Sequence, residues 1–111
     1  MLNRGLLIVR PGPGFISWAL SLDDSGLAPD PRGEQTAYLV PQFEDDTEAD
    51  QVLADAYLEI FESELCGWHT DEDEWPADRS LALFKRWFAV EMHSVVEDLC
   101  GYSIEDDEFE V

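Results

Sequence analysis

The histidines, cysteines and carboxylates of this chain are the side chains that could support catalysis or bind a metal. His69 follows Glu62 and Cys66 at spacings typical of a helix end. His93 precedes Glu97 by four residues, which would place both on one face of a helix. Imidazole, thiolate and carboxylate groups are the usual ligands of zinc and iron. One alternative is therefore a small metal-dependent enzyme or metal-binding protein that uses His69 or His93 with nearby carboxylates.

The known metal-binding and catalytic motifs are nevertheless missing. A transition-metal site needs three or four convergent ligands, and the chain has no CxxC, HxxxH or HExxH motif. Asp71 and Asp73 resemble the start of a calcium-binding EF-hand loop, but Pro76 stands where glycine is required and Ala82 where the bidentate glutamate belongs. Carboxylate pairs are so abundant that none stands out as a general acid and base. We therefore predict no catalytic residue, no cofactor and no specific metal site.

The net charge is the most unusual property of the chain. Six Lys and Arg face 26 Asp and Glu, which gives a formal net charge of −20. Such a charge repels nucleic acids and anionic membranes, so we expect no direct binding to either. A hydrophobic content of 45%, with 12% aromatic residues, is typical of a folded chain rather than a disordered one. Basic proteins are the partners that this composition favours.

The acidic residues are concentrated in the middle of the chain. Between Gly33 and Asp78 there are 15 acidic residues and no Lys or Arg. This stretch is either a solubilising surface or an interaction surface for a basic protein, in one version a nucleic-acid mimic whose carboxylates stand in for phosphates. Two tryptophans would anchor a partner if they were exposed, and would only cover the core if they were not. The candidate partner-binding residues are Asp55, Glu59, Glu62, Trp68, Asp71, Glu72, Asp73, Glu74 and Trp75.

Strands and short helices are expected in the first half. The apolar runs at residues 5–10 and 36–43 predict two strands, the second of which ends at Pro41 or lies at a sheet edge. Between them, residues 15–22 have apolar side chains at helical spacing and predict a helix. Residues 23–35 are rich in Gly, Pro and Asp and predict an exposed loop.

Two long helices are expected in the second half. Thr47 is a suitable N-cap for the first, which should end near Cys66. Pro76 fits the start of the second, with Asp78 or Ser80 as the cap, and this helix should end near Cys100. Its apolar stripe consists of Leu81, Phe84, Phe88, Met92, Val95 and Leu99. The tail from about residue 103 is expected to be frayed, or to add a short edge strand at Tyr102 and Ile104. The prediction is one α+β domain over residues 1–111, with a two- to three-stranded sheet covered by helices in the order β-α-β-α-α.

Three segments resemble small acidic bacterial proteins of unknown function: LLIVRPGPGFISWALSL, YLVPQFEDD and EIFESELCGWHTDEDEWPADRSLALFKRWF. The resemblance covers nearly the whole chain and implies a bacterial cytoplasmic setting, but it supplies no catalytic or ligand residue. The chain has neither a signal-peptide pattern nor an apolar run of the roughly 18 residues that a membrane helix needs, which also favours the cytoplasm and reduced cysteines. Our leading hypothesis is a non-enzymatic interaction or regulatory protein, a monomer or homodimer, that binds a basic protein.

Overall fold

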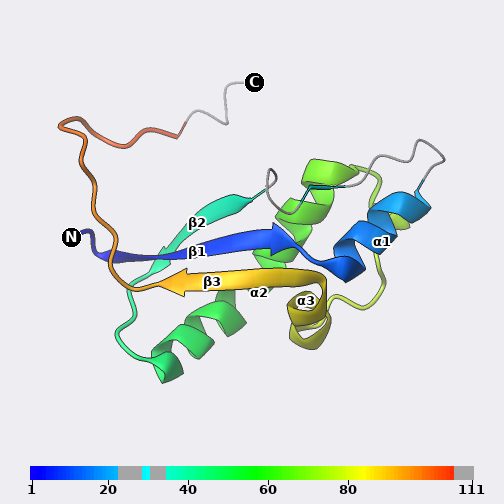
Figure 1. The fold of residues 1–111 in the computed structure, drawn as a ribbon, viewed down its shortest axis with the longest axis horizontal. Coiled ribbons are helices and arrows are strands. Elements are labelled where there is room, and N and C mark those ends of the chain that lie inside the picture. The colour runs from blue at the N-terminus through cyan, green and yellow to red at the C-terminus, as the bar shows by residue number, and fades with distance from the viewer. Residues whose placement is uncertain (23–28, 31–34, 107–111) are drawn as a thin grey trace.

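The computed structural model describes residues 1–22, 29–30 and 35–106, and it has an α+β fold (Figure 1). The predicted class is confirmed, and the three strands of the described sheet agree with the predicted two to three. Two features differ from the prediction: only one helix is long, and a strand follows the last helix. Most of the predicted 23–35 loop lies outside the described residues. The elements are β1 (Arg4–Pro11), α1 (Pro13–Ser21), β2 (Thr36–Pro41), α2 (Asp46–Trp68), the 3-10 helix η1 (Glu72–Glu74), α3 (Leu81–Trp87) and β3 (Phe88–His93).

The three strands form an antiparallel sheet in the order β2-β1-β3. Leu7 in the central strand lies opposite Tyr38 of β2 and Met92 of β3, and its side chain is buried toward the helices. Alternate residues of a strand point to opposite faces, so Leu6 and Ile8 point to the other side. Figure 1 shows α2 behind the strands, and no described helix crosses in front of them. The sheet is therefore packed on one face and open on the other.

An aromatic cluster joins the last helix and the last strand to α2. The fully buried ring of Phe61 lies 5.6 Å from the rings of Phe84 and Phe88, and 5.7 Å from that of Trp87. Complete burial of a single phenylalanine contributes about 1.5–3 kcal/mol to folding. No polar or charged residue is buried among the described residues. Burial of these rings is therefore the main stabilising term available to this acidic chain.

The predicted second long helix is wrong, because its second half is strand β3 and an irregular tail. The spacing of four between Phe88 and Met92 fits one face of a helix, but it is also an even number and fits one face of a strand. In the structure Val90 lies between them on the same inward side, while Glu91 alternates to the other face. Because this segment pairs with the free edge of β1, it forms a strand, with a period of two residues, instead of a helix. Beyond the strand, Leu99 is 96% exposed, so the expected apolar stripe ends at Met92.

The ends of α2 also differ from the prediction. Asp45 rather than Thr47 is the N-cap, and its carboxylate accepts a hydrogen bond of 2.8 Å from the backbone N–H of Glu48. The helix continues through Gly67 to Trp68 instead of ending at Cys66. Asp45 precedes Thr47 and is a stronger capping residue, so the helix starts two positions earlier than it would with Thr47 as the cap.

The remaining elements follow the sequence more closely. The first strand and the first helix lie within one to two residues of the predicted bounds, and β2 is an edge strand that ends at Pro41. Residues 94–106 contain no helix or strand, so the edge strand expected at Tyr102 and Ile104 is not present. Both cysteines are free and exposed. In the part of the chain that the structure describes, no helix is long and apolar enough to cross a membrane.

The packing of α1 on α3 depends on Gly14. A Cβ atom there would lie 2.7 Å from Nε1 of Trp87, whose ring is held by Phe15 and Phe61. We expect Gly14→Ala to lower the free energy of unfolding by about 1–3 kcal/mol, because the indole cannot move away without disturbing the cluster. Urea denaturation measures this change.

Gly67 provides the matched control, because a Cβ atom at that helical position meets nothing within 4 Å. Gly67→Ala is expected to raise the free energy of unfolding by about 0.5–1 kcal/mol, since alanine loses less backbone entropy in a helix. Similar effects of the two substitutions would contradict the close contact between Gly14 and Trp87.

Candidate functional site

The acidic residues predicted to bind a partner lie on α2 and in the loop that follows it. Asp55 and Glu59 are exposed and one helical turn apart. Glu62 is less free, because its carboxylate lies 3.5 Å from Nε of Arg79. Arg79 also stacks over the ring of Trp75, with 5.8 Å between its guanidinium carbon and the ring centroid. A basic side chain from the segment before α3 therefore neutralises one end of the predicted surface.

The loop between α2 and α3 presents five carboxylates to solvent, four of them at or beside η1. Asp71 caps η1 by accepting a hydrogen bond of 3.0 Å from the backbone N–H of Asp73. Glu72, Asp73 and Glu74 form the single turn of η1, and all three are exposed. The sequence prediction that these acids point outward is consistent with this geometry.

Trp68 and Trp75 are not free anchors. Both are partly buried and pack against the hydrophobic core. The indole N–H of Trp75 donates to the carbonyl of His69 at 2.8 Å, and that of Trp18 donates to the carbonyl of Glu74 at 2.9 Å. Trp68 and Trp75 thus cover the core, which is the second of the two roles considered for them. The indoles of Trp75 and Trp18 also fix the loop. The carboxylates of η1 are consequently displayed on a loop that is held in place.

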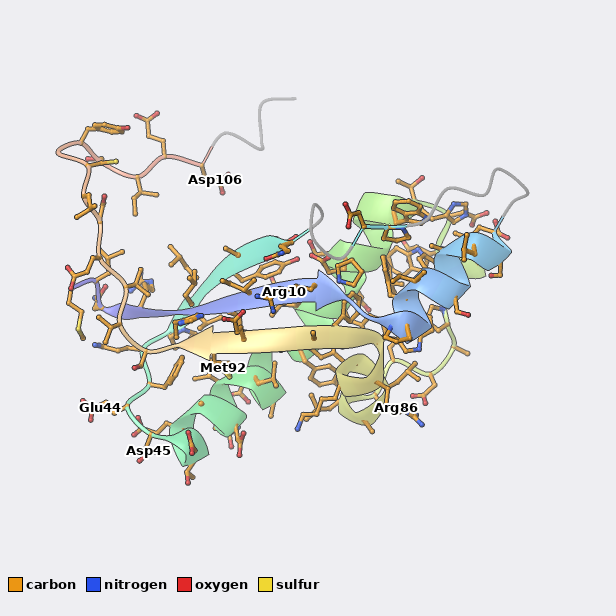
Figure 2. All side chains as sticks on the ribbon, in the orientation of Figure 1. Arg10, Glu44, Asp45, Arg86, Met92 and Asp106 are labelled. Atoms are coloured by element: carbon orange, nitrogen blue, oxygen red, sulfur yellow. The ribbon has the colours of Figure 1, made fainter. Side chains whose placement is uncertain are left out.

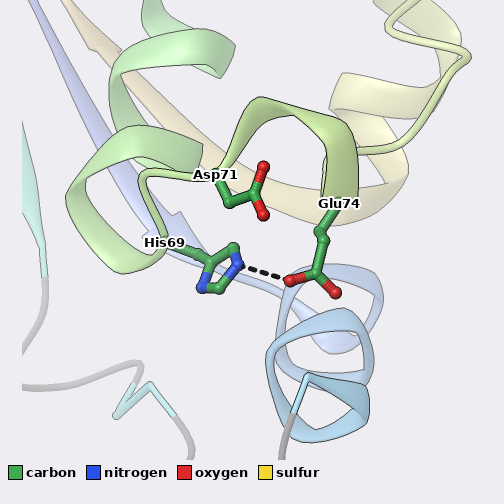
Figure 3. A group of neighbouring side chains, drawn as sticks. All are labelled: His69, Asp71 and Glu74. Atoms are coloured by element: carbon green, nitrogen blue, oxygen red, sulfur yellow. Dashed lines mark hydrogen bonds and ion pairs between the residues drawn. The ribbon is translucent and has the colours of Figure 1, made fainter.

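A histidine and two carboxylates converge in this loop (Figure 3). Nε2 of His69 lies 3.0 Å from Oε1 of Glu74, and one ligand atom each from His69, Asp71 and Glu74 lie within 4.8 Å of one another. One imidazole with two carboxylates is a donor set suited to zinc or manganese. The structure does not bring His69 together with Glu62 and Cys66, the combination considered from the sequence. The spacing from 69 to 71 to 74 matches no metal motif, and only the turn at η1 makes the three residues neighbours.

His93 lies in a different environment from the one expected. Because it belongs to β3 and not to a helix, it does not face Glu97, which instead lies 3.1 Å from the terminal ammonium of Met1. Nε2 of His93 is 3.3 Å from a carboxylate oxygen of Glu91, which also forms an ion pair with Arg10, labelled in Figure 2. The hydrogen bond and charge of Arg10 hold the pKa of Glu91 below its usual value. These three side chains lie on the open face of the sheet, since Arg10 and Glu91 are on alternate positions from the buried ones.

A cleft of about 340 Å³ between β2 and the end of α2 was not predicted from the sequence. Tyr38 and Glu64 line it, and the phenol donates a hydrogen bond to the carboxylate. Burial and the neighbouring Glu64 raise the pKa of Tyr38 well above 10, so the phenol remains neutral and acts as a donor. No spacing in the sequence indicates this pair, because it forms between a strand and a helix 26 residues apart.

Comparisons with protein-family models, with curated proteins and with solved structures give no match for this chain. The resemblance to small acidic bacterial proteins therefore stays a prediction.

The Tyr38–Glu64 pair predicts a dependence of stability on alkaline pH. The unfolded state releases the phenol proton near pH 10, while the folded state retains it, so stability should fall as the pH rises above 10. Tyr38→Phe should make this fall smaller. At pH 7 the substitution should cost about 1 kcal/mol, because Glu64 loses a hydrogen-bond donor. Urea denaturation at pH 7 to 11 tests both, and identical pH profiles would contradict the raised pKa.

Proposed function

We propose that this protein is a non-enzymatic interaction protein that binds a basic protein through the exposed carboxylates of α2 and η1. The observation that carries the proposal is the charge pattern of α2, which has acidic residues and no Lys, Arg or His. Within the described residues, a Lys or Arg side chain reaches one of them, Glu62. The acidic residues of α2 are Asp46, Glu48, Asp50, Asp55, Glu59, Glu62 and Glu64.

Folding alone does not account for these charges. Asp46 and Glu48 are favourable, because they lie at the positive end of the helix dipole. Asp55 and Glu59 are like charges at a spacing of four, which destabilises a helix by a few tenths of a kcal/mol, roughly 0.2–0.5. Acids near the C-terminal end, such as Glu62, oppose the dipole. Lysine or arginine side chains from a partner would relieve this repulsion, which supports a binding role.

The rigid loop extends the same chemistry beyond the helix. The backbone that carries its carboxylates is held by the two indole hydrogen bonds to the carbonyls of His69 and Glu74. A preorganised charged surface loses less conformational entropy on binding and steers an oppositely charged partner toward it. Nucleic-acid mimicry is one form of this proposal, in which carboxylates one helical turn apart take the place of phosphates.

The experiment uses oligolysine and oligoarginine peptides as probes and measures affinity by fluorescence anisotropy. We expect affinity to fall steeply, by roughly tenfold or more, between about 50 and about 300 mM NaCl, because exposed charges are screened over that range. Neutralising the helix surface with Asp55→Asn and Glu59→Gln should weaken binding at low salt by roughly threefold or more.

Asp98→Asn with Glu105→Gln is the matched control, because it removes the same charge from the exposed tail. This control should leave affinity close to that of the wild type. Equal losses of affinity in the two double variants would show that the total charge, and not the surface of α2, determines binding, which would contradict the proposal. Affinity that does not change with salt would also contradict it.

Divalent-cation binding by His69, Asp71 and Glu74 is a second candidate function. The specific observation that favours it is the convergence of an imidazole and two carboxylates within 4.8 Å. The indole of Trp75 holds the carbonyl of His69 in place at 2.8 Å, so the backbone that carries the imidazole is fixed. A cation here would be held at the surface, because both carboxylates are exposed.

Isothermal titration with Zn²⁺ and Mn²⁺ tests this second candidate. We expect one equivalent of cation to bind, and His69→Ala to weaken binding by roughly tenfold or more through loss of a ligand. His93→Ala is the matched control and should change nothing, because His93 lies on the sheet away from this cluster. Equal effects of the two substitutions, or only weak binding at many sites, would contradict a defined site.

A further inference from the structure

The open face of the sheet is an incomplete apolar surface. At its centre are Leu6 and Ile8 of β1, which lie opposite Leu39 and Ala37 of β2. Leu39 is 48% exposed, and no helix of the described residues covers this side (Figure 1). A sheet with apolar residues on a face normally packs that face against another layer. The described residues of the chain therefore supply no second layer for this face of the sheet.

The charge of this open sheet face differs from that of the helix side. Arg4 and Arg10 point to it from the two ends of β1, since they alternate with the buried positions of that strand. The carboxylate that β3 contributes to this face, Glu91, is already paired with Arg10. With Arg10 paired, Arg4 still gives this apolar surface a positive charge, which is complementary to a segment that combines apolar and acidic side chains.

The tail that follows β3 is such a segment. Large apolar side chains are displayed there instead of being buried, with exposed fractions of 96% for Leu99, 77% for Tyr102 and 66% for Ile104. Four acidic residues accompany them in the described part of the tail: Glu97, Asp98, Glu105 and Asp106. Tyr102 and Ile104 are two residues apart and would point to the same side in an extended conformation.

The tail is directed away from the open sheet face of its own chain. The backbone N–H of Leu2 donates to the carbonyl of Val96 at 2.7 Å, and the ammonium of Met1 lies 3.1 Å from Glu97. These contacts fix the start of the tail beside the first residues of the chain. From there, Figure 1 shows it passing outside the β2 edge instead of crossing the strands. The exposed apolar side chains Leu99, Tyr102 and Ile104 are thus available to another molecule.

We propose that the tail of one copy binds the open sheet face of a second copy, and that reciprocal exchange gives a two-fold symmetric dimer. Apolar contacts of Leu99, Tyr102 and Ile104 with the centre of the face supply the attraction, and Arg4 offers a positive charge to the tail carboxylates. The acidic helix α2 lies on the opposite side of the sheet, so the two strongly charged surfaces remain apart. This inference does not depend on the proposed binding of a basic protein.

Sedimentation equilibrium of the full chain over a range of concentrations tests the dimer. It is done under reducing conditions because both cysteines are exposed. The wild type should be dimeric, and Leu99→Asp with Ile104→Asp should raise the dimer dissociation constant by roughly tenfold or more. Leu58→Asp, which changes a leucine of α2 that is 43% exposed, is the matched control and should leave the dimer intact.

A mixing experiment distinguishes tail exchange from other dimers. Leu39→Asp places a charge on the open sheet face and leaves the tail intact. If circular dichroism shows that Leu39→Asp does not fold, Ala37→Asp on the same face is used in its place. The face variant and the tail variant should each be monomeric alone and should form a heterodimer when mixed, because one tail and one face remain intact. A wild type that stays monomeric at the highest concentration overturns the proposal. A dimer that survives the tail substitutions, or a mixture without heterodimers, also overturns it.

Discussion

The aromatic cluster around Phe61 is the interaction on which the rest of the structure depends. A net charge of −20 opposes any compact state, and α2 gains little from ion pairs. The cluster offsets this repulsion by joining α2 to α3 and β3 through the rings of Phe84 and Phe88. All described charged residues stay at the surface. The fold therefore separates an uncharged interior from a strongly acidic exterior.

This separation is uneven between the two sides of the sheet. The helix side carries the unneutralised carboxylates of α2 and the fixed acids of η1, whereas the open sheet face carries leucines, isoleucine and two arginines. A basic protein is thus suited to the helix side, and a segment with both apolar and acidic side chains is suited to the open sheet face. Raised salt should weaken the first interaction through screening, and should not weaken the second to the same degree, because apolar contacts dominate it.

The sequence predicts best those elements that Gly and Pro delimit. Strand β1 ends at Pro11, where the sequence Pro-Gly-Pro-Gly begins, and β2 ends at Pro41, so the bounds of both are nearly those predicted. Prediction from the sequence fails where one spacing fits both a helix and a strand, as with Phe88 and Met92. The choice between helix and strand there depends on pairing with the edge of β1, which is distant in the sequence. The cluster of His69, Asp71 and Glu74 could not be foreseen for a related reason. Its geometry comes from a turn that Trp18 and Trp75 fix through hydrogen bonds, and no local pattern encodes those contacts.

The most direct test of the central claim is to map where a basic ligand binds. Amide chemical shifts recorded during titration with oligolysine report each residue separately. We expect the largest changes around Asp55, Glu59 and residues 71–74, and we expect about 300 mM NaCl to abolish them. Changes spread evenly over the surface, or centred on the open sheet face, would contradict the assignment of the acidic helix and loop as the binding surface.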